Sequence, residues 1–171
     1  MRRRMLALLV AVALVALVLP ANVFAAEAEV TCTVTAVLIS VTVSDGDVDY
    51  GALALGAEED TIGLNDTQTV TNTGNVREDF TIKSSDATRD GGTNWALGAT
   101  AGNNTFTHAF STNGGGNWSL MGLADNYYPL ASGIAPNATQ VFDLQIGMPT
   151  STTDYWEHTI IITVLAVAAE E

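Results

Sequence analysis

The fold class is decided by QVFDLQIGM, residues 140–148. Apolar side chains occupy the even positions from 142 to 148, and Asp143, Gln145 and Gly147 stand between them. Successive side chains of a β-strand point to opposite faces, so this period of two predicts a strand with one buried and one solvated face. No segment beyond the first 25 residues sustains the 3.6-residue period of a helix. The sequence therefore predicts an all-β protein.

Other apolar and Thr-rich runs, each bounded by turn-forming residues, predict the remaining strands. They are expected at residues 30–43, 67–73, 76–83, 95–97, 106–110, 117–121 and 158–167. In the first run the apolar phase slips between Leu38 and Ile39, which indicates a bulge or a strand that passes between sheets. Thr73-Gly74-Asn75 predicts a hairpin between the second and third runs. This pattern favours an immunoglobulin-like antiparallel β-sandwich of about seven to nine strands, whose last strand pairs with its first.

The N-terminal 25 residues have the anatomy of a secretory signal peptide. Arg2-Arg3-Arg4 precedes an apolar run from Met5 to Leu19, and Val23 and Ala25 stand three and one residues before the expected cleavage site. We expect cleavage before Ala26 and a single mature domain over residues 26–171. The alternative is an uncleaved membrane anchor, but the apolar run is shorter than the ~20 residues that span a bilayer.

The charge balance excludes several classes of partner. The chain carries six basic and 19 acidic residues, a net charge of −13. Loss of the signal peptide would remove three arginines and leave only Arg77, Lys83 and Arg89 as cations, giving a mature charge of −16. A polyanion of this kind does not bind nucleic acid or anionic membrane surfaces. We therefore expect a secreted protein that is extracellular or displayed at the cell surface, with no membrane insertion after cleavage.

Cys32 is the one cysteine in the sequence, so no disulfide can form within a single chain. Two interpretations remain open. The thiol is either a small buried hydrophobe on the first strand or one half of a disulfide between two molecules.

Val70-Thr71-Asn72-Thr73-Gly74-Asn75 resembles the V-x-N-x-G hairpin of immunoglobulin-like modules in bacterial and archaeal surface proteins. The resemblance covers about twenty residues and implies a β-sandwich without assigning an activity. In that family the Asn and Gly, here Asn72 and Gly74, shape the turn, because both residue types tolerate positive φ.

Trp95-Ala96-Leu97 and Trp118-Ser119-Leu120 resemble the paired W-x-L motifs of wall-associated domains in Gram-positive bacteria. Val48-Asp49-Tyr50-Gly51 is similar to an aromatic-Gly step in those domains. The resemblance implies non-covalent attachment to peptidoglycan; the alternative is that both tryptophans are core residues. Residues 111–118 also resemble a degenerate Asp-box, which implies a β-hairpin with Trp118 packed beneath it.

Three carboxylates at a spacing of two residues form a candidate calcium site. Asp45, Asp47 and Asp49 would share one face of an extended strand, where a cation would relieve their mutual repulsion. The spacing does not fit an EF-hand loop. The alternative is a solvated acidic edge that discourages aggregation.

Six aromatic residues supply flat faces that could stack on sugars, and several of them fall in expected loops. They are Trp95, Trp118, Tyr127, Tyr128, Tyr155 and Trp156. No comparable set indicates catalysis, since His108 and His158 both sit in apolar or Thr-rich patterns without the context of a nucleophile-His-acid site. The sequence therefore predicts no enzyme and no cofactor other than a calcium ion.

The last expected strand is apolar on both faces, unlike residues 76–83, where Phe80 and Ile82 point inward and polar residues point out. If Ile160, Ile162 and Val164 face the core, then Ile161, Leu165 and Val167 face solvent. Contiguous exposed apolar side chains usually mark an interface, unless another part of the chain covers them. We expect a non-enzymatic extracellular structural protein that self-associates or binds other surface proteins; the alternative is a carbohydrate- or wall-binding module.

Overall fold

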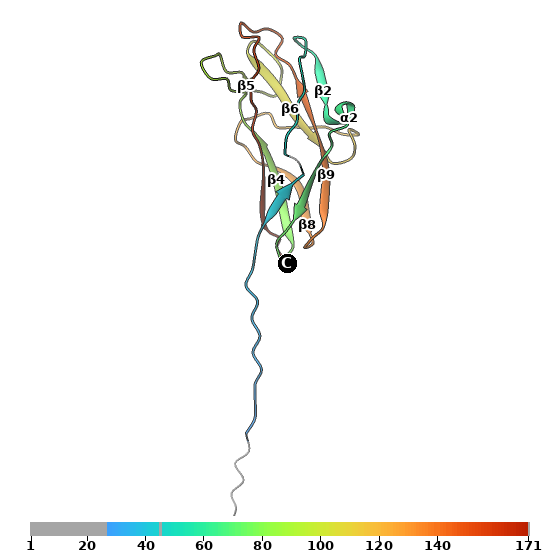
Figure 1. Cartoon of the computed structure of the whole chain (residues 1–171), viewed down its shortest axis with the longest axis vertical. Coiled ribbons are helices and arrows are strands. Elements are labelled where there is room, and N and C mark those ends of the chain that lie inside the picture. Colours follow the sequence, from blue (N-terminus) through green and yellow to red (C-terminus); the bar gives the residue numbers. More distant parts are fainter. Residues whose placement is uncertain (1–26, 45, 171) are drawn as a thin grey trace, which may run out of the picture. The chain divides into compact units, whose positions relative to one another are not determined.

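The computed structural model describes residues 27–44 and 46–170, so the expected signal peptide and Asp45 lie outside the described residues. The chain divides after Thr35 into two units. The unit that begins at Ala36 is built almost entirely from β-strands (Figure 1). Its elements are β1 (Val41–Val43), β2 (Glu58–Asp60), the short helix α2 (Thr61–Leu64), β3 (Gln68–Asn72), β4 (Glu78–Ser84), β5 (Ala96–Leu97), β6 (Thr105–Ser111), β7 (Ser119–Leu120), β8 (Tyr128–Ile134), β9 (Thr139–Gly147) and β10 (Ile162–Ala168).

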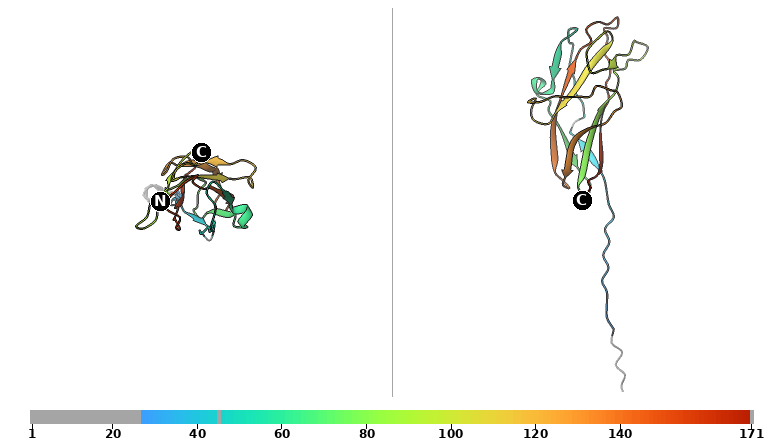
Figure 2. Two further views of the ribbon diagram at one scale, coloured as in Figure 1. Left: turned by 90° about the horizontal axis from the view of Figure 1, so that it is seen from above. Right: turned by 180° about the vertical axis from the view of Figure 1, so that it is seen from behind.

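The strands form two packed sheets, which appear as two layers in the end-on view of Figure 2. The larger sheet has the order β1-β3-β9-β6-β5, with β2 paired to β9 and β7 paired to β6. The smaller sheet has the order β10-β4-β8. The named strand pairs are antiparallel except for the short pair β5 and β6. The all-β sandwich expected from the sequence is confirmed.

The core lies between β9 and β4. Phe142, Leu144 and Ile146 of β9 are at most 4% exposed, as their alternation predicts. Phe80 and Ile82 of β4 face them from the other sheet and are 1% and 0% exposed. Two strands with a period of two therefore contribute alternate side chains to the core from opposite layers.

Asp143 was expected on the solvated face of β9, and this expectation is wrong. The residue is only 2% exposed, because the turn of α2 covers that face. Its Oδ1 accepts hydrogen bonds from the hydroxyls of Thr61 (3.3 Å) and Thr67 (2.6 Å). The buried Asp143 carboxylate is therefore paired with side-chain hydroxyls from the segment around α2.

The expected hairpin at Thr73-Gly74-Asn75 is also wrong, because the chain changes sheets there. β3 lies in the larger sheet and β4 in the smaller one. Fully buried Asn72 joins the two layers, since its Nδ2 donates to the carbonyls of Val76 and Ile134, both at 2.8 Å. Its Oδ1 accepts from the amide of Gly74 at 2.8 Å. The motif is a corner between sheets.

Gly74 is required at this corner by close approach. A Cβ there would overlap the Glu78 carboxylate and the Leu38 carbonyl. Glu78 is itself fully buried, and its Oε1 accepts from the amide of Ser40 at 2.9 Å. A buried acid in this position was not expected from the sequence.

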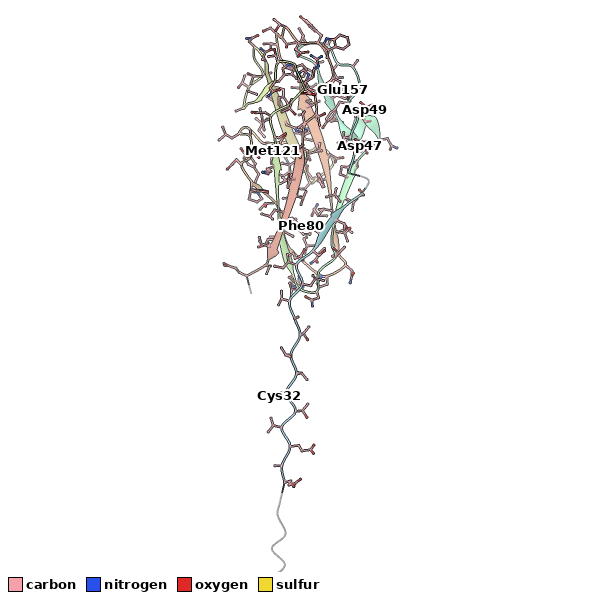
Figure 3. The ribbon with its side chains drawn as sticks, turned by 60° about the vertical axis from the view of Figure 1, so that its left-hand side comes forward. Cys32, Asp47, Asp49, Phe80, Met121 and Glu157 are labelled. Carbon is pink, nitrogen blue, oxygen red and sulfur yellow. The ribbon has the colours of Figure 1, made fainter. Side chains whose placement is uncertain are left out.

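The first predicted strand is much shorter than residues 30–43. Residues 27–40 contain no strand, and only Val41–Val43 forms β1. Cys32 is exposed (Figure 3), so its interpretation as a buried core residue is wrong. The expected pairing of the last strand with the first is wrong as well, because β10 pairs with β4 and β1 pairs with β3.

The turn between β6 and β7 is the hairpin expected from residues 111–118. The two strands pair antiparallel, with Phe110 opposite Ser119. Asn113 closes the turn by accepting at Oδ1 from the amide of Asn117 at 3.0 Å. Trp118 is half-buried and lies against Gly115, whose φ of +78° favours glycine.

Candidate functional site

A cleft of about 1070 Å³ opens between the two sheets on the side where β10 is the edge strand. One wall comes from the larger sheet, the opposite wall from β10 and the residues before it, and residues 46–55 line a further side. The principal wall residues are Phe142, Leu144 and Ile146 of β9, His108 of β6, Trp95, and Ile160, Ile162 and Val164 at β10. The cleft is therefore an extension of the hydrophobic core.

A chain of buried polar side chains crosses the base of this cleft. The His108 Nε2 lies 3.1 Å from the Tyr50 hydroxyl, and its Nδ1 lies 2.9 Å from the Ser84 hydroxyl. Burial lowers the pKa of His108 to about 4, so the ring is neutral at pH 7. Burial, with the negative charges of Asp60 and Asp66, raises the pKa of the Tyr50 phenol. The arrangement connects residues 46–55 to both sheets; Ser84 is fully buried in it.

The six aromatic residues predicted to bind sugar do not form one surface. Trp95, Tyr155 and Trp156 line the same cleft. Trp95 is 7% exposed and stacks on His158, with ring centroids 3.9 Å apart, so it is a core residue. Tyr155 and Trp156 are 74% and 71% exposed at the cleft rim.

The other three aromatics lie elsewhere. Trp118 packs under the β6–β7 turn, and the Lys83 ammonium lies 5.1 Å from the Tyr127 ring centroid. Tyr128 was expected in a loop, but it is the first residue of β8 and is half-buried against the core. That strand was missed because Tyr127-Tyr128-Pro129 has the composition of a loop.

The loop that carries Tyr155 and Trp156 is fixed by Asp154. Its carboxylate accepts from the Arg89 guanidinium (2.9 and 3.0 Å) and from the amides of Thr93 (2.8 Å) and Trp156 (3.2 Å). The Thr93 amide, followed by Arg89 and the Trp156 amide, lowers the pKa of Asp154. The Arg89 guanidinium also lies 5.6 Å from the Trp156 ring centroid. The exposed aromatic pair is thus held on a rigid support.

Asp47 and Asp49 lie on the segment that follows β1 (Figure 3). Both residues line the cleft. The Oδ1 of Asp49 accepts from the amide of Gly51 at 2.8 Å, which closes a tight turn at the positive φ of that glycine. The third member of the predicted calcium site, Asp45, lies outside the described residues. Elsewhere in the described chain, no three His, Cys, Asp or Glu side chains are grouped as a metal site. Calcium binding stays a prediction.

β10 has the two faces that its sequence predicts. Ile160, Ile162 and Val164 are partly buried against the core. Ile161, Leu165 and Val167 are 62%, 43% and 45% exposed. The strand also lies at the end of its sheet, so one row of its backbone amides and carbonyls lacks a strand partner among the described residues. It is an exposed apolar edge, a feature that folded proteins usually protect.

Comparisons of the chain with protein-family models, curated proteins and solved structures give no match. None of the helices in the described part of the chain is long and apolar enough to cross a bilayer. The site is therefore interpreted from its own chemistry.

Proposed function

We propose that this chain is a secreted, non-enzymatic structural protein of the cell surface or of an extracellular assembly, built as an immunoglobulin-like module. The observation that carries the proposal is the last strand: β10 has a free edge, and three exposed aliphatic side chains lie on it and on the residue before it. Leaving such side chains in water forgoes roughly 1.5–3 kcal/mol each. An edge of this kind favours association with further copies of the chain or with another surface protein.

The secreted location rests on the N-terminal sequence and is tested separately. The intact mass of protein recovered from culture medium should correspond to a chain that begins at Ala26 or one residue later. A mass that retains residues 1–25 would contradict secretion and favour a membrane anchor.

Self-association is tested by sedimentation of the secreted protein over a hundredfold range of concentration. The wild type should associate, and Ile161→Thr/Leu165→Thr should weaken association because Thr keeps strand propensity while removing exposed apolar area. Leu123→Thr/Val141→Thr is the matched control, since these residues are 66% and 47% exposed elsewhere on the molecule. A wild type that stays monomeric throughout would refute the structural proposal.

A second candidate function is binding to carbohydrate or cell wall, consistent with the W-x-L resemblance. It is favoured by Tyr155 and Trp156, two consecutive exposed aromatics on a support held by Asp154. Such rings offer large flat faces at low entropic cost. Pull-down on insoluble peptidoglycan should retain the wild type, and Tyr155→Ala/Trp156→Ala should lose retention while Tyr127→Ala keeps it. Equal recovery of all three proteins would contradict this function.

A further inference from the structure

Building on the proposed self-association, we infer how two copies join: residues 27–35 of one copy add as a strand to the free edge of β10 in a second copy and fill its cleft. The acceptor is the half-open core at β10. The donor is the segment that precedes Ala36. A single chain contains both the acceptor edge and the donor segment.

The acceptor site is indicated by a difference in burial between the inward side chains of β4 and those of β10, two strands of one sheet. Phe80 and Ile82 of β4 point into the sandwich and are at most 1% exposed. Ile162 and Val164 of the adjacent β10 point to the same interior and are only partly buried. Both strands present the same kind of residue to the same core, so the difference lies in what covers them. β4 has a strand on each side, whereas β10 ends the sheet and borders the cleft.

The donor half is shown by the sequence and exposure of residues 27–35. Val30, Cys32 and Val34 alternate with three threonines, which gives a period of two. β-branched residues in this pattern are typical of a half-buried strand. Yet the segment forms no strand, and Val30 and Val34 are 86% and 97% exposed. It is a strand sequence without a sheet.

The dimensions of donor and acceptor agree. A β-strand rises about 3.3 Å per residue, so residues 27–35 extend about 30 Å and the seven residues of β10 about 23 Å. Side chains on one face of the donor are Ala28, Val30, Cys32 and Val34, which are small enough to enter a cleft between two sheets. The opposite face carries Glu and Thr, which suit the surface.

A second copy is favoured over insertion into the same chain. Residues 36–40 are bound along the corner, where the Leu38 amide donates to Asn75 Oδ1 and Asn75 Nδ2 donates to the Ala36 carbonyl, both at 2.8 Å. From there the chain continues into β1. Residues 29–43 contain no Gly, Pro, Asn or Asp, so nothing in the sequence favours the reversal that would return the segment to its own sheet.

Two paired variants test the inference on the secreted protein by sedimentation. Val30→Asp/Val34→Asp places charges on the face that would enter the cleft, and Thr31→Asp/Thr33→Asp places the same charges on the opposite face. The exposed positions of all four residues leave the folded unit intact, which circular dichroism verifies. The first variant should raise the dissociation constant of the assembly at least a hundredfold. The control should assemble within about threefold of the wild type.

Cys32 supplies a second measurement because it is the one thiol in the chain. In assembled wild type its reaction with a maleimide should slow at least tenfold relative to Val30→Asp/Val34→Asp, since the donor face becomes buried. An inaccessible thiol in a protein that sediments as a monomer would overturn the inference in favour of insertion into the same chain.

The outcomes separate the two proposals. If wild type and Val30→Asp/Val34→Asp assemble equally while Ile161→Thr/Leu165→Thr does not, the outward face of β10 joins the copies; strand donation is then wrong and the structural function stands. If the wild type remains monomeric at every concentration with a freely reactive thiol, both proposals fail.

Discussion

β4 and β10 lie side by side in the smaller sheet, paired over seven residues, and only β4 has a strand on each side. Both strands have an alternating inward face rich in Ile, Val or Phe. The outward face of β4 carries Asp79, Thr81 and Lys83, which are suited to water. The outward face of β10 carries Leu165 and Val167, and Ile161 directly before the strand is exposed as well. Because the inward faces are alike in composition but differ in burial, position in the sheet decides how completely the inward face of each strand is covered.

The two strands therefore have different roles in the folded protein. β4 connects the two layers, because its inward side chains pack against those of β9. The turn that precedes β4 is joined to the larger sheet through Asn72. β10 supplies one wall of an open cleft and leaves its far edge unpaired among the described strands. The inward side chains of β4 are enclosed between the sheets, whereas those of β10 border the cleft.

The largest effect should come from truncating the same residue type on each strand. Ile82→Ala should lower the free energy of unfolding by about 4 kcal/mol, because it leaves a cavity at a fully enclosed site. Ile162→Ala should cost about 1–2 kcal/mol, since its side chain already borders the cleft. Urea unfolding of dilute protein measures both values. Equal losses would mean that β10 is as fully covered as β4 in the monomer.

The corner that leads into β4 should be nearly as sensitive. Asn72→Ala leaves the carbonyls of Val76 and Ile134 and the amide of Gly74 without their side-chain partner. Unpaired buried groups cost about 1–3 kcal/mol each, and partial relaxation should bring the total loss to about 3 kcal/mol. Asn113→Ala is the control, because it also removes a side-chain oxygen that accepts from a turn amide, but on the exposed β6–β7 hairpin. It should lower the free energy of unfolding by about 1 kcal/mol. If the two losses are alike, Asn72 does not join the sheets.

The polar chain that spans the interior should make stability depend on pH. The pKa of His108 is lowered from 6.5 to about 4 by burial, so the unfolded chain takes up a proton at a higher pH than the folded chain does. Stability is thus fully present above pH 6.5 and falls as the pH drops toward 4, by about 3 kcal/mol in all. Unfolding of wild type and His108→Gln across this window measures the effect. The variant should show a flatter profile, and parallel profiles would contradict a neutral buried His108.

The elements predicted correctly are those whose pattern is local. The alternation in residues 140–148 and in β4 indicates directly which side chains point inward. Residues 111–118 form a hairpin through hydrogen bonds between their own side chains and backbone amides. Asn72 and Gly74 were recognised as a turn, but the same residues serve a hairpin or a corner between sheets. Which one forms depends on partners from β8 that lie more than sixty residues away, such as Ile134.

The candidate site was predicted only in part for the same reason. The exposed face of β10 follows from counting along one strand, and it lies where the sequence predicts. Residues 46–55 line the cleft together with β6, β9 and β10. No pattern within one stretch of sequence indicates that these elements lie next to one another. The segment around Cys32 was predicted wrongly for a related reason. Its alternation of apolar residues and threonines predicts a strand, but that alternation does not indicate which sheet, or which molecule, such a strand would pair with.

The smallest effect should come from the outward face of β10, and it tests whether the two faces of this strand differ as its exposure indicates. In dilute monomeric protein, Ile161→Thr/Leu165→Thr should change the free energy of unfolding by no more than about 0.5 kcal/mol, because exposed side chains contribute little to folding. Ile162→Thr/Val164→Thr makes similar replacements on the inward face, and it should cost several times more because it places hydroxyls against the core. Urea unfolding at a concentration below the onset of association compares the two. A loss above about 1 kcal/mol in the first variant would show that the outward face is covered within the monomer, and would remove that face as a contact surface for a second copy.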